Sequence, residues 1–322
     1  MANVESPSSR TPARVPLWVR PEAGSDALAQ PTRAAPHPHS RAGKPVPLAL
    51  LSFDVEQFDI PTEYGIEISV EKQFEIGRAG LATVLQLLDK CNAPATFFIT
   101  AEFALRFPRL IRTITERTAS KADPQRPHEI ASHGYTHGEL EEGHLLQSRK
   151  VLEQITGQPI RGFRRARMAP TDSYAVAAAG YAYNASENPI WLPGRYNHFF
   201  KARRPYVART NTGPLVQIPC SATPLVRVPL FWLAFKNMPL TITKLASRWV
   251  LAADGSLNTY FHPWEFTDIG TYELPKVVRA ISGQPLLDRL GTYIRWLQER
   301  AELSTYNTLA ERILAREQEH RA

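Results

Sequence analysis

The chain of 322 residues has few cysteines and no long apolar stretch. Its two cysteines, Cys91 and Cys220, are too few to build a metal site from cysteine and need not form a disulfide. No run of about 18 apolar residues occurs, which argues against a membrane-spanning segment. Lysine and arginine do not cluster with aromatic residues, so nucleic-acid binding is not indicated. No internal repeat is present, which excludes a repeat architecture.

The composition is that of a soluble enzyme, with 43% hydrophobic and 21% charged residues and a net charge of +7. Residues 1–45 are rich in Pro, Ala, Arg and Ser and lack the apolar core of a signal peptide. We therefore expect a disordered or non-native extension over 1–45 and a catalytic domain over 46–322. The missing signal favours a cytoplasmic location, with export as the alternative.

An apolar run from Val46 ends in several acids, the last of them Asp59. This pattern predicts a buried strand that carries carboxylates at its end. Asp54 and Glu56 are two residues apart and would share one face, while Val55 points the other way. Two buried acids require a metal, an arginine or a set of hydrogen bonds to offset their charge. The alternative is a strand that ends in a solvated acidic turn.

Strands and helices alternate along the rest of the chain, which predicts an α/β fold. Polar side chains follow several of the strands, which favours a barrel-like fold with its site at the strand ends. Further strands are expected at 95–100, 129–132, 160–164, 215–218 and 257–261, and helices at 70–91, 101–117, 140–156, 172–179, 242–252, 286–300 and 309–316.

His133 and His137 are four residues apart and can converge on one point. Two imidazoles and one carboxylate leave open positions on a metal, as a hydrolytic site requires. The pair alone is weak evidence, because such spacing is often incidental. Together with the acids at the end of the first strand and His262 at the end of a later one, it predicts a metal site.

Four motifs together resemble the polysaccharide deacetylase family with the NodB homology domain, also called carbohydrate esterase family four. They occur in the order of the family and cover about residues 46–300. The resemblance implies a distorted (β/α) barrel with fewer than eight strands, and we expect seven. The motifs are Ser52-Phe53-Asp54-Val55-Glu56, Ser132-His133-Gly134-Tyr135-Thr136-His137, Gly162-Phe163-Arg164 and Phe261-His262-Pro263-Trp264-Glu265.

The resemblance further implies hydrolysis of an N-acetyl amide on an amino sugar of a polysaccharide or a lipid-linked glycan. His133 and His137 match the family's ligands for a divalent metal, for which we expect zinc, with cobalt and nickel as alternatives. Asp54 matches the catalytic base and Arg164 the arginine that pairs with it. His262 matches the general acid that protonates the leaving amine.

The first motif departs from the commonest family form, in which two aspartates are adjacent. Val55 stands at the second position and cannot bind metal, so Glu56 is the natural replacement. Asp59 is a second candidate, and the alternatives are that Asp54 itself binds the metal or that no metal is bound. The third motif departs as well, because Arg165 and Arg167 precede the Ala-Pro that follows the arginine in many relatives. Arg167 is therefore an alternative to Arg164.

Aromatic and polar residues in the segment 188–197 suit the recognition of a sugar ring. We assign Trp191, Arg195, Tyr196 and also Trp264 to substrate binding, with a well-packed loop and a core tryptophan as the alternatives. Two other functions stay open. One is a hydrolase of the same fold that acts on a small cyclic amide or ureide, and the other is a carbohydrate-binding protein without activity.

Overall fold

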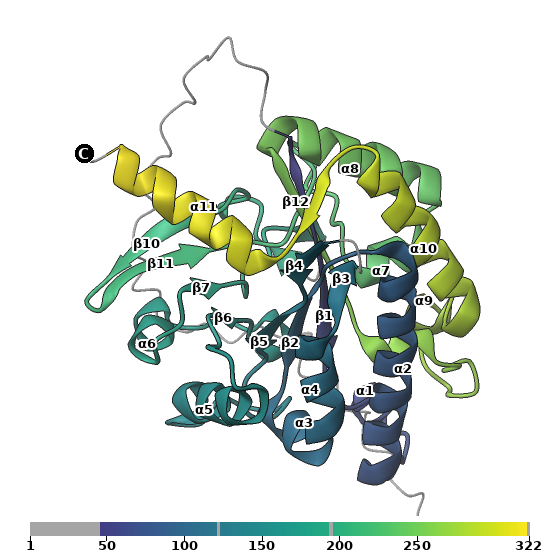
Figure 1. Cartoon of the computed structure of the whole chain (residues 1–322). Helices are drawn as coiled ribbons and strands as arrows, with labels where there is room; N and C mark the ends of the chain where they lie inside the picture. The colour runs from purple at the N-terminus through teal and green to yellow at the C-terminus, as the bar shows by residue number, and fades with distance from the viewer. Residues whose placement is uncertain (1–45, 121–122, 193–195, 321–322) are drawn as a thin grey trace, which may run out of the picture.

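A computed structural model describes residues 46–120, 123–192 and 196–320, with a curled sheet of nine strands at its centre (Figure 1). The neighbours across the sheet are β10-β11-β7-β6-β5-β2-β1-β12, and β13 pairs with the beginning of β1. All pairings are parallel except that of β10 with β11. The strands are β1 Leu48–Val55, β2 Thr96–Ile99, β5 Glu129–Ser132, β6 Gly162–Phe163, β7 Tyr183–Asn184, β10 Tyr206–Thr210, β11 Gly213–Gln217, β12 Ser256–Phe261 and β13 Glu302–Ser304.

Helices follow most of the parallel strands, and most of them pack against the outside of the sheet (Figure 1). Two small hairpins lie outside the main sheet, β3 Thr118–Ser120 with β4 Asp123–Pro127 and β8 Trp191–Leu192 with β9 Tyr196–Asn197. The helices are α1 Ile60–Glu63, α2 Val70–Cys91, α3 Ala101–Arg106, α4 Pro108–Glu116, α5 His144–Thr156, α6 Ser173–Ala178, α7 Trp232–Asn237, α8 Leu240–Asp254, α9 Lys276–Arg279, α10 Gly283–Gln298 and α11 Tyr306–Glu319, with short 3₁₀ turns at Ala166–Met168 and Pro263–Phe266.

The α/β barrel-like fold is confirmed, but the expected number of seven strands is wrong. The strands β7 and β13 have only two and three residues, too few for a recognisable alternation. The expected helix over 101–117 is two helices, because Phe107 leaves the helical conformation and Pro108 begins α4. The helix expected from residue 140 begins at His144 instead.

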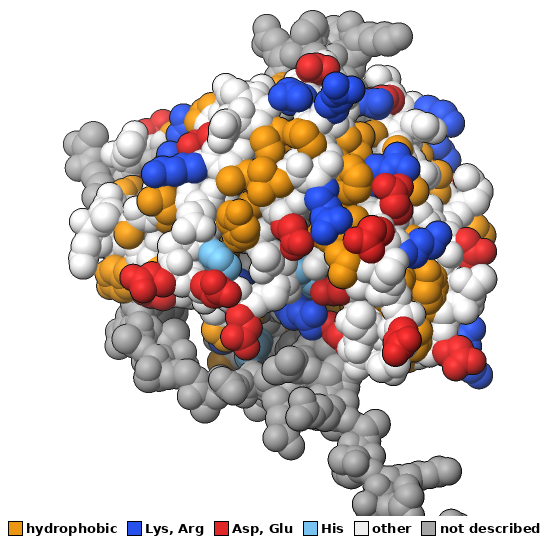
Figure 2. Space-filling model, turned by 90° about the horizontal axis from the view of Figure 1, so that it is seen from below, with side chains coloured by type: hydrophobic (Ala, Val, Ile, Leu, Met, Phe, Trp, Pro, Cys, Tyr) orange, Lys and Arg blue, Asp and Glu red, His pale blue; other side chains and the backbone are white. Residues whose placement is uncertain are grey.

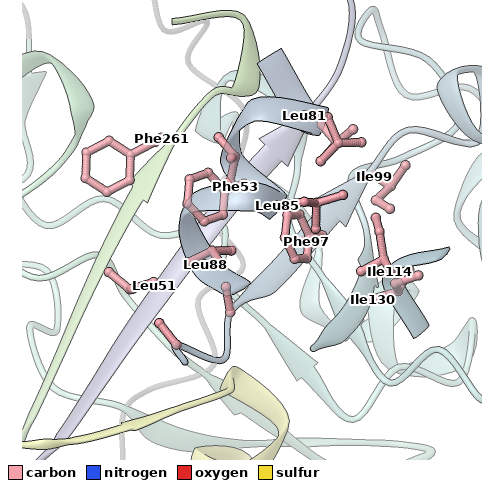
Figure 3. Close-up of a cluster of buried hydrophobic side chains, with 14 of the residues drawn as sticks. Leu51, Phe53, Leu81, Leu85, Leu88, Phe97, Ile99, Ile114, Ile130 and Phe261 are labelled. Carbon is pink, nitrogen blue, oxygen red and sulfur yellow. The ribbon is translucent and has the colours of Figure 1, made fainter. Parts of the chain in front are cut away.

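The central strand β1 separates two apolar cores, as the alternation of its side chains predicts. Leu51, Phe53 and Val55 belong to the larger core between the sheet and the helices. Figure 3 shows Leu51 and Phe53 among the side chains of α2, β2 and β12 in this core. Leu48 and Leu50 belong instead to the core inside the curled sheet. Asp54 is an even number of residues from Leu48 and Leu50, so its side chain also points to the inside of the curled sheet.

Helix α2 lies unusually close to the end of β1 and to the turn after β12. A Cβ atom at Gly77 would lie 2.4 Å from the carbonyl oxygen of Glu56. A Cβ atom at Gly80 would lie 1.9 Å from the carbonyl oxygen of Pro263. Side chains at these positions would push the helix away, so the two glycines allow α2 to support both segments directly.

One buried side chain joins β12 to the segment that follows β11, across the gap in the curled sheet. The Asn258 side chain accepts a hydrogen bond from the Ser221 backbone N–H and donates one to the Pro219 carbonyl. The Asn258 backbone N–H in turn donates to the Ser221 hydroxyl. The edges of the sheet are thus linked by side-chain hydrogen bonds instead of a strand pairing. Within the described residues, no helix is both long and apolar enough for a membrane span.

We predict that Gly80→Ala destabilises the protein by about 2 kcal/mol, because the new methyl group must displace the backbone at Pro263. Helix propensity alone would stabilise the variant by up to about 1 kcal/mol. Urea unfolding measures the difference, with Ala79→Gly at an exposed position of α2 as the matched control. A Gly80→Ala variant more stable than wild type would contradict the close packing of α2.

A second prediction concerns His128, which is buried next to β5. Its Nδ1 accepts a hydrogen bond from the Ala95 N–H, and its Nε2 has no hydrogen-bond partner in the described part of the chain. Burial, together with the positive charge of Arg117, lowers the pKa of His128 to about 4. His128 therefore becomes protonated below about pH 6.5 in the unfolded chain, but only below about pH 4 in the folded protein.

Stability should consequently fall as the pH decreases through this window, and His128 should account for about 2 kcal/mol of the loss at pH 5. The measurement is the free energy of unfolding at pH 7.5 and pH 5 for wild type and for His128→Gln. The decrease should be smaller in the variant by that amount. An equal decrease in both proteins would show that His128 is not held neutral.

Candidate metal and catalytic site

Polar side chains from four strands meet at one end of the curled sheet. Asp54 and Glu56 come from the end of β1, and His133 and His137 from the turn after β5. Arg164 directly follows β6, and His262 directly follows β12. Figure 2 views the molecule from below, the end at which α1 and α3 lie in Figure 1, and histidine side chains are visible there among charged ones. Parallel strands with a common direction thus bring residues distant in sequence to one edge.

Three of these residues, Glu56, His133 and His137, form a buried cluster whose ligand atoms lie within 4.8 Å of one another. Glu56 Oε2 is 2.8 Å from His137 Nε2 and 3.2 Å from His133 Nε2. The other ring nitrogens are already engaged. His133 Nδ1 is 3.0 Å from the Arg164 carbonyl oxygen, and His137 Nδ1 is 2.7 Å from Asp59 Oδ2. Both Nε2 atoms are therefore oriented toward the carboxylate.

The electrostatics of the cluster are those of a cation site. Burial alone would raise the pKa of Glu56, but the neighbouring histidines lower it well below its usual value. Burial would lower the pKa of His137, but the carboxylates of Glu56 and Asp59 raise it to about 10. A proton on His137 thus offsets the negative charge, and a divalent cation can replace that proton. The two imidazoles and one carboxylate are a donor set that can hold a divalent metal.

A second buried pair consists of Asp54 and Arg164. Arg164 donates from Nη1 to Asp54 Oδ1 at 2.5 Å and to the Ser52 hydroxyl at 3.0 Å. Its Nη2 donates to the Tyr306 hydroxyl at 2.8 Å, and its guanidinium lies 3.9 Å from the centroid of the Phe98 ring. Burial opposes the charge of Arg164, but Asp54 outweighs it and raises the pKa of Arg164. The second oxygen of Asp54, Oδ2, lies 4.0 Å from His133 Nε2 and faces the cluster.

His262 lies on the other side of the cluster, with its Nε2 3.8 Å from Glu56 Oε1. Its Nδ1 is 3.1 Å from Glu265 Oε1, which also accepts the His262 backbone N–H. The fully buried Lys236 binds the other carboxylate oxygen of Glu265 at 3.1 Å and donates to the Val278 carbonyl. Burial raises the pKa of Glu265, but Lys236 and His262 lower it below its usual value. A charged Glu265 therefore fixes the ring so that Nε2 faces the site.

Asp59 and Arg167 form an outer layer beside His137. Arg167 pairs with Asp59 through Nη2 at 3.3 Å and with Glu63 through Nη1. It does not contact Asp54, so Arg164 and not Arg167 is the partner of that carboxylate. Asp59 binds the rear nitrogen of His137 and orients the ring, which is the usual position of an outer-layer carboxylate in metal sites.

Of the four residues assigned to substrate binding, only Trp264 has a side chain in the described part of the structure. Trp264 is fully buried, so its assignment to substrate binding is wrong, since a substrate cannot reach the ring. It stacks on His262 at 4.9 Å between ring centroids and donates from Nε1 to Glu56 Oε1 at 3.4 Å. Arg195 and the side chains of Trp191 and Tyr196 lie outside the described part of the structure.

Sequence reasoning missed three residues that the fold brings to the site. Tyr306 begins α11 and holds Arg164, Lys236 in α7 holds Glu265, and the half-buried Trp232 lies edge-on to His262 at 5.1 Å. None of them belongs to a local motif, so only the three-dimensional contacts identify them. The complete arrangement brings two carboxylates, three imidazoles and an arginine together in one buried cluster, and such groups can carry out general acid–base hydrolysis.

Comparison with known proteins agrees with this arrangement. The family model described as polysaccharide deacetylase matches residues 67–185, which include His133, His137 and Arg164. The matched range does not reach Asp54, Glu56 or His262. No curated protein matches the sequence.

Several solved structures share the fold at low sequence identity. A protein named as a polysaccharide deacetylase from Mycobacterium smegmatis is 20% identical, with 89% of this chain and 96% of the other covered at a TM-score of 0.57. One so named from Pseudomonas aeruginosa PAO1 is 16% identical, with 82% and 89% covered at 0.54. Puue allantoinase is 18% identical, with 94% and 97% covered at 0.57. The chain is thus similar to the polysaccharide deacetylase family over residues 67–185, and the three solved structures share its fold.

Proposed function

We propose that the protein is a metal-dependent hydrolase that removes N-acetyl groups from amino sugars of a polysaccharide or a lipid-linked glycan. The observation that carries the proposal is the position of Asp54 and His262 on two sides of the Glu56–His133–His137 cluster. Glu56, His133 and His137 would hold a divalent ion, which supplies Lewis-acid polarisation of the amide carbonyl.

The residues of the chain divide the proton transfers between them. Asp54 is held by Arg164 through one oxygen, so its other oxygen can accept the proton of the attacking water. His262 presents Nε2 to the site because Glu265 binds Nδ1, so it can donate a proton to the leaving amine. The products are acetate and a free amino sugar. Removal of either group would leave the cation site in place and stop one proton transfer.

A small cyclic amide or ureide is the second candidate substrate. The chain shares its fold over nearly its full length with Puue allantoinase. Allantoin therefore belongs in the same assay as N-acetylated glycans. Hydrolysis of the ureide without release of acetate would favour this second candidate over the first.

The metal site is tested by the metal content of the purified protein. We predict about one divalent ion per chain, and loss of the ion in Glu56→Gln and His133→Ala, because each removes one of three ligands. Asp59→Asn should weaken binding by only about 10–100-fold, since Asp59 acts through His137. A loss in Asp59→Asn with retention in Glu56→Gln would instead make Asp59 the acidic ligand.

The activity is tested by release of acetate from N-acetylated chitooligosaccharides and peptidoglycan fragments. We predict that Asp54→Asn and His262→Ala each lower kcat by about 10²–10⁴-fold while the metal content stays at the wild-type level. Glu75→Gln, which removes only a surface ion pair with Arg78, serves as the control. Metal-loaded wild type that releases neither acetate nor hydrolysed allantoin would indicate a binding protein without catalysis.

A further inference from the structure

Helix α8 presents three of its large apolar side chains to the outside of the molecule. Ile242, Leu245 and Trp249 are 47%, 67% and 41% exposed and recur at the spacing of one helical face. The face toward the protein has the small residues Thr243, Ala246 and Ser247 in its first half, followed by Val250 and Leu251. An ordinary surface helix carries polar side chains on its outer face, so three large apolar side chains in this position are unusual.

The inner face of α8 is packed against neighbouring elements of the protein. The Ser247 hydroxyl is 2.6 Å from the Tyr293 hydroxyl of α10, and Thr243 and Ala246 are buried beside it. Small residues there allow the helix to pack closely on its neighbours. Figure 1 shows α8 on the outside of the molecule next to β12 and α10. The outer stripe is therefore left without a partner among the described residues.

Positive charge surrounds this apolar stripe. Lys244 and Arg248 are the charged residues of α8 before its last residue, and Arg248 is exposed. The last residue, Asp254, is bound by both Arg203 and Arg204, so its negative charge is more than offset. The half-buried Trp296 of the neighbouring α10 has two cations over its ring, Lys244 of α8 and Arg300, which follows α10. The acid beside them, Glu299, pairs with Arg300.

We propose that the outer face of α8 binds the surface of an anionic lipid membrane. Leucine, isoleucine and tryptophan with flanking lysine and arginine are the composition of helices that lie in the lipid interface. A second copy of the chain fits less well, because a symmetric contact through this face would bring Lys244 and Arg248 of both copies together. Three large apolar side chains also supply less area than a stable dimer requires. The proposal concerns attachment and is independent of catalysis.

The experiment is co-sedimentation of the full-length protein with vesicles of phosphatidylcholine alone or mixed in equal parts with phosphatidylglycerol. We expect binding to the mixed vesicles only, and weaker binding at high salt, because salt screens the basic side chains. The double variant Leu245→Gln, Trp249→Gln should bind at least about tenfold more weakly, since it removes two apolar side chains from the lipid contact.

Leu105→Gln, at an exposed leucine of α3, is the matched control and should bind like wild type. All the substituted side chains are exposed, so the variants should unfold at the wild-type temperature. Unchanged vesicle binding of the double variant would overturn the proposal and assign binding to another part of the chain. A dimer in light scattering that the double variant abolishes would overturn it as well, by showing that α8 is a self-association surface.

Discussion

The site depends on one constraint, which is that two carboxylates at the end of β1 are buried and must be neutralised locally. The structure meets this constraint separately for each acid. Asp54 is bound by a buried arginine, while Glu56 lies among three imidazoles. This division leaves one oxygen of Asp54 directed toward the cluster and leaves Glu56 suited to a cation. The two acids at the end of β1 thus have different surroundings because their partners differ, which is the basis on which we propose one as the base and the other as the ligand.

The side chains that surround these carboxylates are in turn held by residues from distant parts of the chain. Arg164 is itself fully buried and needs Tyr306, which begins the last helix. Glu265 needs Lys236, which lies in α7 and donates a hydrogen bond to the Val278 carbonyl of α9. Each buried charge therefore depends on a partner from another helix, and that helix must be folded for the partner to be in position. The folding of the C-terminal half and the geometry of the site are consequently coupled, although its polar motifs are spread over about two hundred residues.

The main strands and the polar motifs at their ends were predictable from the sequence, because alternation and strand-end position are local properties. The strand β1, the helix α2 and the convergence of His133 with Glu56 follow from such patterns. Tyr306 and Lys236 were not predictable, since a long-range hydrogen bond leaves no periodic signal. The sequence also did not indicate which face of α8 is exposed. The helix itself was predicted. From the sequence alone, Ile242 and Leu245 would be placed on the buried face, and only the contact of Ser247 with α10 shows that the buried face is a different one.

The parity of β1 also accounts for the acid-x-acid form of the first motif. Val55 pairs with Ile99 in regular register, and its side chain lies in the core between sheet and helices. An acid at position 55 would be placed in that core, away from the histidines, unless the backbone departed from the strand. Glu56 lies on the correct side, and its carboxylate reaches both His133 and His137. A regular strand that continues to Val55 therefore places an acid beside the two histidines at position 56, where the sequence has a glutamate.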